Sequence, residues 1–336
     1  MNAVVEPAVA QAARAQARTH GADVVAASYL SVFTDDYVLH DTTLAGIYAK
    51  AKTQQWNAQT DIDWSVQLDP DNPLDMPDGT VVLYNSRLWN AMGAADRTCV
   101  RQHVQSWNLS QILHGEQAAL MCAAKLAQTS GELDVKLCSA IQANDEARHV
   151  EVFSRLLGGH FASSYPVSKS LRALLQDTLA DSRPDITSLG MQILVEGIAL
   201  SIFQSVRGYS QSAYVKDIFS RVLRDEARHF GAGQVTLRAF YGEIGSREKA
   251  EREEFICESA MRLHDHLCGD DIWEPIGLSR RECGEFVRNS AVAQSLRRSL
   301  FRRLVPSVRD LGLLGARTSR VFEELGVLSY AEYPVS

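Results

Sequence analysis

The sequence predicts an all-α protein with a four-helix core and additional helices at both ends. From about Tyr84 onward, apolar residues recur with the period of a helix, and alternating strand-like runs are scarce. Proline is absent from residue 78 to residue 165, as long helices require. The pentapeptide DEARH occurs at 145–149 and again at 225–229, which indicates a helical unit repeated at a spacing of 80 residues.

The chain divides into three stretches that together form a single domain. Residues 1–80 are an N-terminal extension that packs on the bundle and ends in the proline-rich loop DPDNPLDMPDG. Trp56 and Trp64 are predicted to anchor this extension by packing. Residues 81–245 form the core, and residues 246–336 add C-terminal helices, predicted at 246–268 and 279–304.

The core is predicted to contain two helical hairpins. The first has helices at 96–129 and 132–157, where Gly158 and Gly159 are expected to stop the second helix. A connecting helix at 168–181 leads to the second hairpin, which runs from 185 to 207, turns near Ser210 and ends at about Gly242.

Composition excludes several classes of protein. With 46% hydrophobic and 22% charged residues, the chain is typical of a globular protein, and a net charge of −7 argues against general affinity for nucleic acid. The six cysteines lack zinc-type spacing and are interpreted as reduced thiols of a cytoplasmic protein. The N-terminus lacks the pattern of a secretory signal, and no uninterrupted apolar run of about 18 residues predicts a membrane span.

Glutamates and histidines recur at matched positions of the repeat. Each DEARH places a glutamate three residues before a histidine, and a further glutamate lies 30 residues upstream of each copy's glutamate. The six candidate metal-ligating and catalytic residues are Glu116, Glu146, His149, Glu196, Glu226 and His229.

The spacing of these residues has a geometric meaning. A turn midway between paired glutamates lets one helix climb, and the next descend, by about 15 residues or roughly 22 Å, so both glutamates reach the same height. The i and i+3 residues of Glu-x-x-His share one helix face. Two such hairpins bring four carboxylates and two imidazoles together, which is the donor set of a dinuclear iron or manganese site in a bundle. Without cations, so many carboxylates on apolar faces would be prohibitively costly to bury.

The aspartate and arginine of DEARH suggest support for the histidines. Metal-bound histidines commonly donate their second N–H to a carboxylate. Asp145 and Asp225 are expected to face a neighbouring helix, so each could hold the histidine of the opposite repeat, with Arg148 and Arg228 balancing their charge.

With this six-residue pattern, the stretch from Asp96 to Gly242 resembles ferritin-like di-iron carboxylate proteins of the oxygen-activating branch. That branch includes multicomponent monooxygenase hydroxylases, ribonucleotide reductase small subunits, acyl-carrier desaturases and arylamine N-oxygenases. The resemblance implies two iron ions, or a manganese–iron pair, and O2 as co-substrate. It also implies that Glu146 and Glu226 bridge the metals, that Glu116 and Glu196 are terminal ligands, and that the protein is a homodimer.

Three positions depart from particular members of that branch. Phe153 stands where radical-storing reductase subunits carry a tyrosine, and Val222 stands where arylamine N-oxygenases carry a third histidine. Leu200, followed by Ser201, replaces the threonine of the multicomponent monooxygenases. These departures weaken a radical-storage role and leave the type of oxygenation open.

The predicted function is O2-dependent oxidation, of the monooxygenase or N-oxygenase type, of a small and largely apolar organic substrate or carrier-bound metabolite. A lining of Ile112, Leu113, Leu120, Ile193, Leu200 and Phe203 is expected to exclude water. Because no nucleotide fingerprint or iron–sulfur cysteine set is present, electrons are expected from a separate reductase, a small-molecule reductant or the substrate itself. The alternatives are a ferroxidase, a ligand-binding oxidase without organic turnover, and a structural bundle with a vestigial site.

The remaining polar features have plainer interpretations. His114 is expected to be an ordinary polar partner, and His264 and His266 to lie at a solvated helix end. The arginine-rich segment RRSLFRR at 297–303 is interpreted as a solvated helix edge or, alternatively, as a docking face for an acidic carrier or reductase.

Overall fold

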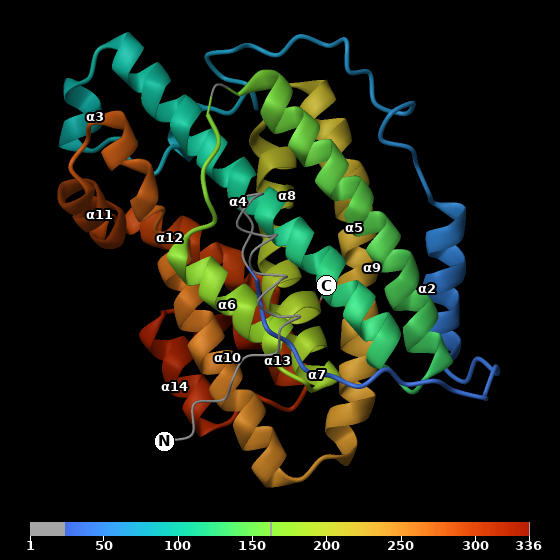
Figure 1. The fold of residues 1–336 in the computed structure, drawn as a ribbon. Helices are drawn as coiled ribbons and strands as arrows, with labels where there is room; N and C mark the ends of the chain where they lie inside the picture. The colour runs from blue at the N-terminus through green and yellow to red at the C-terminus, as the bar shows by residue number, and fades with distance from the viewer. Residues whose placement is uncertain (1–23, 162, 336) are drawn as a thin grey trace, which may run out of the picture.

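The structure, a computed structural model, describes residues 24–161 and 163–335, so the first 23 residues of the predicted N-terminal extension lie outside the described part. Within these ranges the chain forms helices, turns and loops and contains no strand (Figure 1), which confirms the all-α prediction. The core helices are α4 (Ala94–Thr129), α5 (Leu133–His160), α8 (Glu196–Tyr209) and α9 (Ala213–Glu243).

The two predicted hairpins form the core. Helix α4 packs mainly against α5, α8 packs against α9, and α5 and α9 contact each other between the hairpins. Serine caps help to start the helices: Ser212 accepts the N–H of Val215 at the start of α9, and Ser168 accepts that of Leu171 at the start of α6 (Lys169–Ala180). Helix α5 continues through the two glycines predicted to stop it, because glycine weakens a helix interior without breaking it as proline does.

The first helix of the second hairpin is irregular. It consists of α7 (Pro184–Ser188), a π-helical segment η2 (Leu189–Val195), and α8, which begins at Glu196. The π-helical segment was not predicted, because a hydrophobic period of 3.6 residues does not reveal a local widening of the turn. Such segments are frequent at functional sites.

The N-terminal region covers one side of the bundle. Helix α2 (Thr42–Thr53) contacts both α5 and α9, and Asp41 caps its first turn. The proline-rich loop is irregular, as predicted, apart from the short turn η1 (Asp78–Thr80). Gln105 of α4 anchors this loop by accepting the N–H of Leu74 and donating to Asn72 Oδ1. The short helix α3 (Arg87–Ala91) follows.

The C-terminal region is more divided than predicted. Helix α10 (Ser246–His266) packs against α6 and α14, but the helix expected at 279–304 is broken at Ser290, which caps the next helix by accepting the N–H of Ala293. The elements after α10 are η3 (Asp270–Ile272), η4 (Glu274–Ile276), α11 (Arg280–Asn289), α12 (Ala291–Ser299), η5 (Leu300–Arg302), α13 (Leu304–Asp310), α14 (Ala316–Glu324) and η6 (Leu328–Glu332). Boundaries at residues 80 and 245 stay predictions.

The interpretation of the arginine-rich segment as a solvated edge is wrong for Arg297. This side chain is 5% exposed and donates to the carbonyl of Val287 and to His264 Nε2. Arg297 of α12 therefore bonds to a carbonyl of α11 across the break at Ser290.

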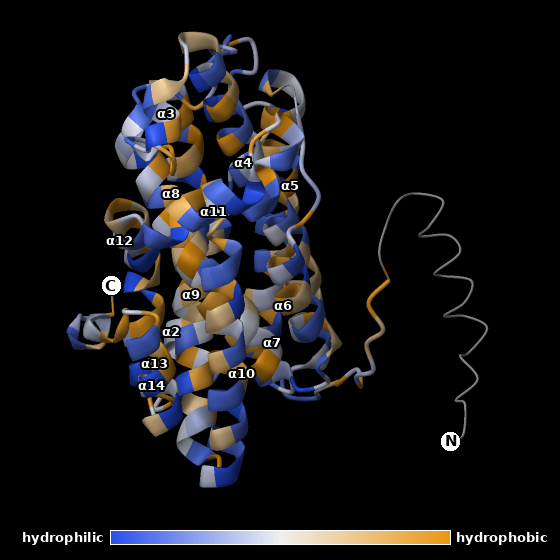
Figure 2. Cartoon of the chain, turned by 90° about the vertical axis from the view of Figure 1, so that its left-hand side faces the viewer, coloured by the Kyte–Doolittle hydropathy of each residue, from blue (hydrophilic) through white to orange (hydrophobic). Residues whose placement is uncertain are grey.

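The most apolar helical stretch of the described chain is buried inside the bundle. The stretch Pro184–Tyr209 is long and apolar enough to cross a membrane, yet 83% of its most apolar window is buried in the protein. That burial is what a central bundle helix requires. Along the outer helices α6 and α10, polar and apolar residues alternate (Figure 2), as expected for helices with one buried face.

Candidate metal centre

All six predicted side chains meet in one buried cluster between the four core helices. Helix α4 carries Glu116, α5 carries Glu146 and His149, α8 begins with Glu196, and α9 carries Glu226 and His229. Their donor atoms form two groups, each with its atoms within 4.8 Å of one another: Glu116, Glu146, His149 and Glu226, and Glu146, Glu196, Glu226 and His229. Glu146 and Glu226 belong to both groups, so they lie where bridging ligands would.

Both imidazoles turn Nδ1 toward the carboxylates. His149 Nδ1 lies 2.9 Å from Glu226 Oε1 and 3.1 Å from Glu116 Oε2. His229 Nδ1 lies 3.0 Å from Glu146 Oε1 and 3.7 Å from Glu226 Oε2. The i,i+3 spacing of each Glu-x-x-His therefore places both side chains toward a common point, as predicted.

Three polar atoms of the cluster are left without a hydrogen bond, although they are buried. They are Glu196 Oε2, Glu226 Oε1 and His229 Nδ1. The last two lie close to possible partners without the geometry of a hydrogen bond, which is the arrangement of lone pairs that converge on a shared ion. Unpartnered buried polar atoms are costly, and carboxylate and imidazole donors suit divalent transition metals. The cluster therefore fits two metal ions.

Burial and neighbouring charges shift the pKa values of the cluster's carboxyl groups in different directions. It raises the pKa of Glu116 and of Glu196 well above the ordinary value, and repulsion from Glu226 adds to the shift. Burial acts on Glu146 in the same direction, but the charge of His229 and hydrogen bonds from both histidines outweigh it and lower the pKa of Glu146.

For the two histidines, burial shifts the pKa in the direction opposite to that for the carboxyl groups. Burial lowers the pKa of His149 and of His229, but contacts with the carboxylates outweigh burial and raise both values well above the ordinary one. In the metal-free cluster, both imidazoles and the carboxyls of Glu116 and Glu196 therefore retain protons to higher pH than the free side chains do. Metal binding has to displace these protons.

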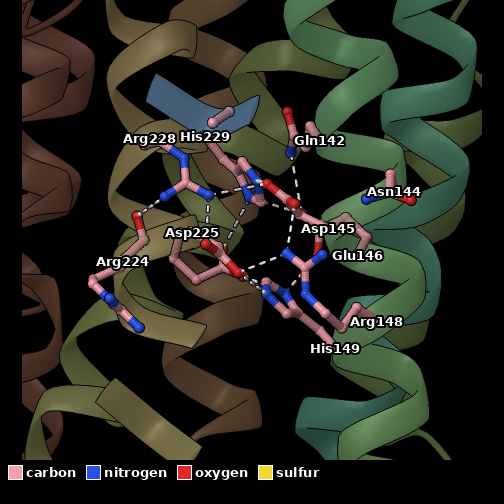
Figure 3. A network of polar contacts seen from close by, with 12 residues as sticks. Gln142, Asn144, Asp145, Glu146, Arg148, His149, Arg224, Asp225, Arg228 and His229 are labelled. Atoms are coloured by element: carbon pink, nitrogen blue, oxygen red, sulfur yellow. Dashed lines mark hydrogen bonds and ion pairs between the residues drawn. The ribbon is translucent and has the colours of Figure 1, made fainter. Parts of the chain in front are cut away.

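The predicted exchange between the repeats is confirmed (Figure 3). His149 Nε2 lies 3.2 Å from Asp225 Oδ2, and His229 Nε2 lies 3.2 Å from Asp145 Oδ2. Arg148 Nη2 lies 2.6 Å from Asp145 Oδ1, so each aspartate meets a guanidinium as expected. This arrangement fixes which nitrogen of each ring faces the carboxylates.

The same network gives the two arginines a second role. Arg148 Nη2 lies 3.0 Å from Asp225 Oδ2 as well, and Arg228 Nη2 lies 3.2 Å from Asp145 Oδ2. Burial raises the pKa of Asp225, but the contacts of His149 and Arg228 outweigh it and lower that pKa. Both aspartates therefore remain charged acceptors for the histidines.

Residues that follow α2 also belong to this network, although the sequence alone suggested only a packing role for Trp56 and did not single out Gln55. Trp56 Nε1 donates to Asp225 Oδ2 at 2.8 Å, and the Arg148 guanidinium lies 4.7 Å from the centre of its ring. Gln55 donates to Asp145 Oδ1 and accepts from Arg148 Nη1. No periodic relation to the repeat marked either residue.

A chain of amide groups, also missed, reaches the metal cluster from η2. Gln142 Nε2 donates to Glu196 Oε1 at 2.8 Å and to Glu146 Oε1 at 3.2 Å. Gln192 Nε2 donates to Gln142 Oε1 at 2.8 Å, and Ser188 Oγ donates to Gln192 Oε1. The sequence held one usable signal, because Gln142 lies four residues before Glu146 on the same face of α5.

A cavity of about 80 Å³ borders Glu116, Glu196 and Glu226. Of the predicted lining residues, only Ile112 and Phe203 reach it; Leu113, Leu120, Ile193 and Leu200 lie elsewhere. The prediction considered the core helices alone, whereas the C-terminal end of α10 closes one side of the cavity. Its further walls include Trp107, Ala119, Leu171, Met191, Ile198, Ile202, Leu263, His266 and Leu267.

Of the histidines outside the cluster, His114 behaves as predicted and His266 does not. His114 Nε2 lies 2.9 Å from the carbonyl oxygen of Tyr165, as expected of an ordinary polar partner. The expectation of a solvated end is wrong for His266, because this half-buried ring lines the cavity. The centroid of the His266 ring lies 5.1 Å from that of the Trp107 ring.

The fold and the cluster together define a ferritin-like helical protein with a site for two metal ions. No protein-family model and no curated protein sequence matches the chain. Among solved structures, it is similar to an R2-like ligand-binding oxidase with an aerobically reconstituted metal cofactor, with 18% identity, a TM-score of 0.51, and coverage of 83% of this chain and 99% of that one.

A variant of such an oxidase with an anaerobically reconstituted Mn/Fe cofactor is also similar. It is 19% identical, with a TM-score of 0.50 and coverage of 81% of this chain and 93% of that one. These similarities confirm the predicted ferritin-like helical fold.

Proposed function

We propose that this chain is an O2-dependent oxidoreductase with two redox-active ions, iron or a manganese–iron pair, and that it acts on a small, largely apolar organic molecule. The observation that carries the proposal is the position of the cavity, which borders three carboxylates of the cluster: Glu116, Glu196 and Glu226. A molecule in the cavity would lie directly against the metals.

The six cluster residues would divide the work of holding the ions. Glu146 and Glu226 would bridge, since they belong to both donor groups, while Glu116 and Glu196 would each serve one ion. Bound ions of this kind supply the electrons that reduce dioxygen.

The surrounding residues hold the ligands and exclude water. Asp225 and Asp145 keep Nδ1 of each histidine turned inward, and Gln142 orients Glu196 by a hydrogen bond of 2.8 Å. The apolar walls of the cavity keep bulk water from the reacting molecule.

The electron balance requires a partner. Hydroxylation and N-oxygenation each place one oxygen atom of O2 on the substrate and release the other as water, with consumption of two electrons and two protons. Desaturation with release of two waters has the same requirement. We propose that a separate reductase, a small-molecule reductant or the substrate itself supplies these electrons, and that a carrier protein is a further possible partner.

A ligand-binding oxidase without organic turnover is the second candidate. It is favoured by the similar solved structures, which are described as ligand-binding oxidases. In that case a molecule would remain in the cavity and oxygen would be consumed without a released product. A ferroxidase would instead oxidise added Fe²⁺ as its substrate.

We propose a homodimer in the cytoplasm, with no nucleic-acid or membrane partner. All six cysteines are free thiols, in keeping with a reducing compartment.

The experiment is metal analysis and oxygen uptake of protein produced with iron and manganese. The proposal expects two metal ions per chain, reductant-dependent oxygen consumption, and an oxidised product of an apolar substrate by mass spectrometry. Glu116→Gln should lose metal, whereas Glu151→Gln, an exposed glutamate of α5, should not. Oxygen uptake without a product would favour the second candidate, and substoichiometric metal with no uptake would indicate a vestigial site.

A further inference from the structure

The cavity beside the metal cluster has two chemically different ends. Glu116, Glu196 and Glu226 form one end, and Trp107 and His266 lie at the other. Trp107 precedes Glu116 by nine residues on α4, which corresponds to about 13 Å along the helix axis. Apolar side chains such as Ile112, between them on the same helix, line the space between the ends.

Trp107 presents a hydrogen-bond donor that nothing in the described protein satisfies. The side chain is 4% exposed, and its Nε1 has no hydrogen-bond partner. The Cζ3 atom of the indole faces Gly269, where an added Cβ would lie 4.0 Å away, and Gly269 is not part of the cavity wall. Because Nε1 lies opposite Cζ3 in an indole, the unsatisfied N–H is on the side away from Gly269.

His266 provides a second donor beside it. Its Nδ1 lies 2.7 Å from Ser168 Oγ, and that oxygen accepts the backbone N–H of Leu171. In the tautomer in which Ser168 donates its hydroxyl hydrogen to Nδ1, the ring hydrogen is on Nε2, and this is the tautomer that the subsite requires. Burial lowers the pKa of His266 to about 4, so the ring is neutral near pH 7.

The charge of the cavity selects among possible acceptors. Among the described residues that line it there is no lysine or arginine, while three glutamates lie at the opposite end. At the end formed by Trp107 and His266, away from the metals, a carboxylate or phosphate on the ligand would find no cation to balance its charge. A carbonyl, ester, amide or ether oxygen needs only the two N–H donors.

We propose that Trp107 and His266 form a recognition subsite for a neutral hydrogen-bond acceptor of the substrate, at the end of the cavity away from the metals. This inference rests on the proposed function, which makes the bound molecule a substrate, and it specifies the chemical class of that substrate. The molecule is an elongated apolar compound with a ketone, ester, amide or ether oxygen at one end, and oxidation falls on its apolar part.

The test compares two uncharged probes in the metal-loaded full-length protein. The first is methyl hexyl ketone, and the second is the alkene in which a methylene group replaces the carbonyl oxygen. Equilibrium dialysis measures the affinity for each. A neutral hydrogen bond contributes about fivefold in affinity, so the wild type should prefer the ketone by about fivefold or more.

His266→Phe and Trp107→Phe keep an aromatic ring and remove one donor each. Each should lower the preference for the ketone several-fold, and comparing the two probes cancels any effect of the variant on cavity size. The matched control is His114→Phe. His114 is also a half-buried histidine, but it lies on α4 outside the wall of this cavity, so the variant should retain the wild-type preference. If Trp107→Phe does not fold, His266→Phe alone decides.

Three outcomes would overturn the subsite: equal affinity for both probes in the wild type, no binding of either, or an unchanged preference in His266→Phe. Binding needs no turnover, so the result is separate from that of the proposed function. Ketone preference in a protein that never consumes oxygen would uphold the subsite and reject the oxidoreductase.

Discussion

Replacing Trp56 by phenylalanine tests how the N-terminal region supports the metal cluster. The indole Nε1 donates to Asp225 Oδ2 at 2.8 Å, and the same oxygen lies 3.2 Å from His149 Nε2. Trp56→Phe keeps an aromatic ring but removes this donor. Asp225 should then hold His149 less firmly, and the imidazole should be less well oriented toward a metal.

The expected size follows from the charge of the acceptor. A hydrogen bond to a charged group contributes about 1.5–3 kcal/mol to stability, and changing a residue that supports a metal ligand lowers metal affinity by about 10–100-fold. We therefore expect Trp56→Phe to lose about 2 kcal/mol of unfolding free energy in the metal-free protein and at least about tenfold in metal affinity.

Trp64→Phe is a closely matched control. Trp64 also donates through Nε1, to the carbonyl oxygen of Ala58 at 2.7 Å, and also lies beneath a guanidinium, that of Arg155 at 4.5 Å. Its acceptor is neutral and it is separate from the metal cluster. This variant should lose about 1 kcal/mol of stability and keep its metal affinity.

The assays are urea unfolding of the metal-free proteins and competition for Mn²⁺ against a chelator of known affinity. Equal metal affinity in Trp56→Phe and Trp64→Phe would refute the role assigned to the bond with Asp225. A stability loss in both variants with no difference in metal binding would reduce Trp56 to a packing residue.

Two further predictions concern the amide chain and the protons of the cluster. An added Cβ at Gly233 would lie 2.7 Å from Gln192 Cβ, so Gly233→Ala should lower the free energy of unfolding by about 1–3 kcal/mol and weaken metal binding. The control is Gly231→Ala, where an added Cβ would meet nothing within 4 Å. In urea unfolding this control should be neutral or more stable by about 0.5–1 kcal/mol. The raised pKa values of His149 and His229 mean that, above about pH 6.5, the folded metal-free protein binds more protons than the unfolded chain. Its thermal midpoint should therefore fall as the pH rises above about 6.5, and the raised pKa values of Glu116 and Glu196 act in the same direction. Metal-loaded protein should show a weaker fall, because metals replace those protons; a midpoint that rises with pH in the metal-free protein would contradict the assignment.

The metal cluster could be predicted because its determinants are local. Glu-x-x-His fixes two side chains on one helix face, and a hairpin of known length returns a second glutamate to the same height. The duplication then doubled a signal that is weak in one copy. Even the exchange of Asp145 and Asp225 between the repeats followed from their place beside the ligands.

The remaining site residues depend on packing between elements that share no period. Trp56 reaches Asp225 across 169 residues of sequence, and His266 meets Trp107 because the end of α10 folds over α4. Gln192 lies in a π-helical segment, which interrupts the helical register that sequence analysis assumes. The predicted cavity lining was right for Ile112 and Phe203 but chose residues of the core hairpins that do not reach the cavity, and it left out the residues of α10.

Anomalous diffraction from crystals grown with iron and manganese tests the central claim most directly. We expect two peaks per chain between the core helices, with Glu146 and Glu226 within bonding distance of both and with His149 and His229 on different ions. A single peak, no peak in metal-replete crystals, or ions held by other residues would contradict the account.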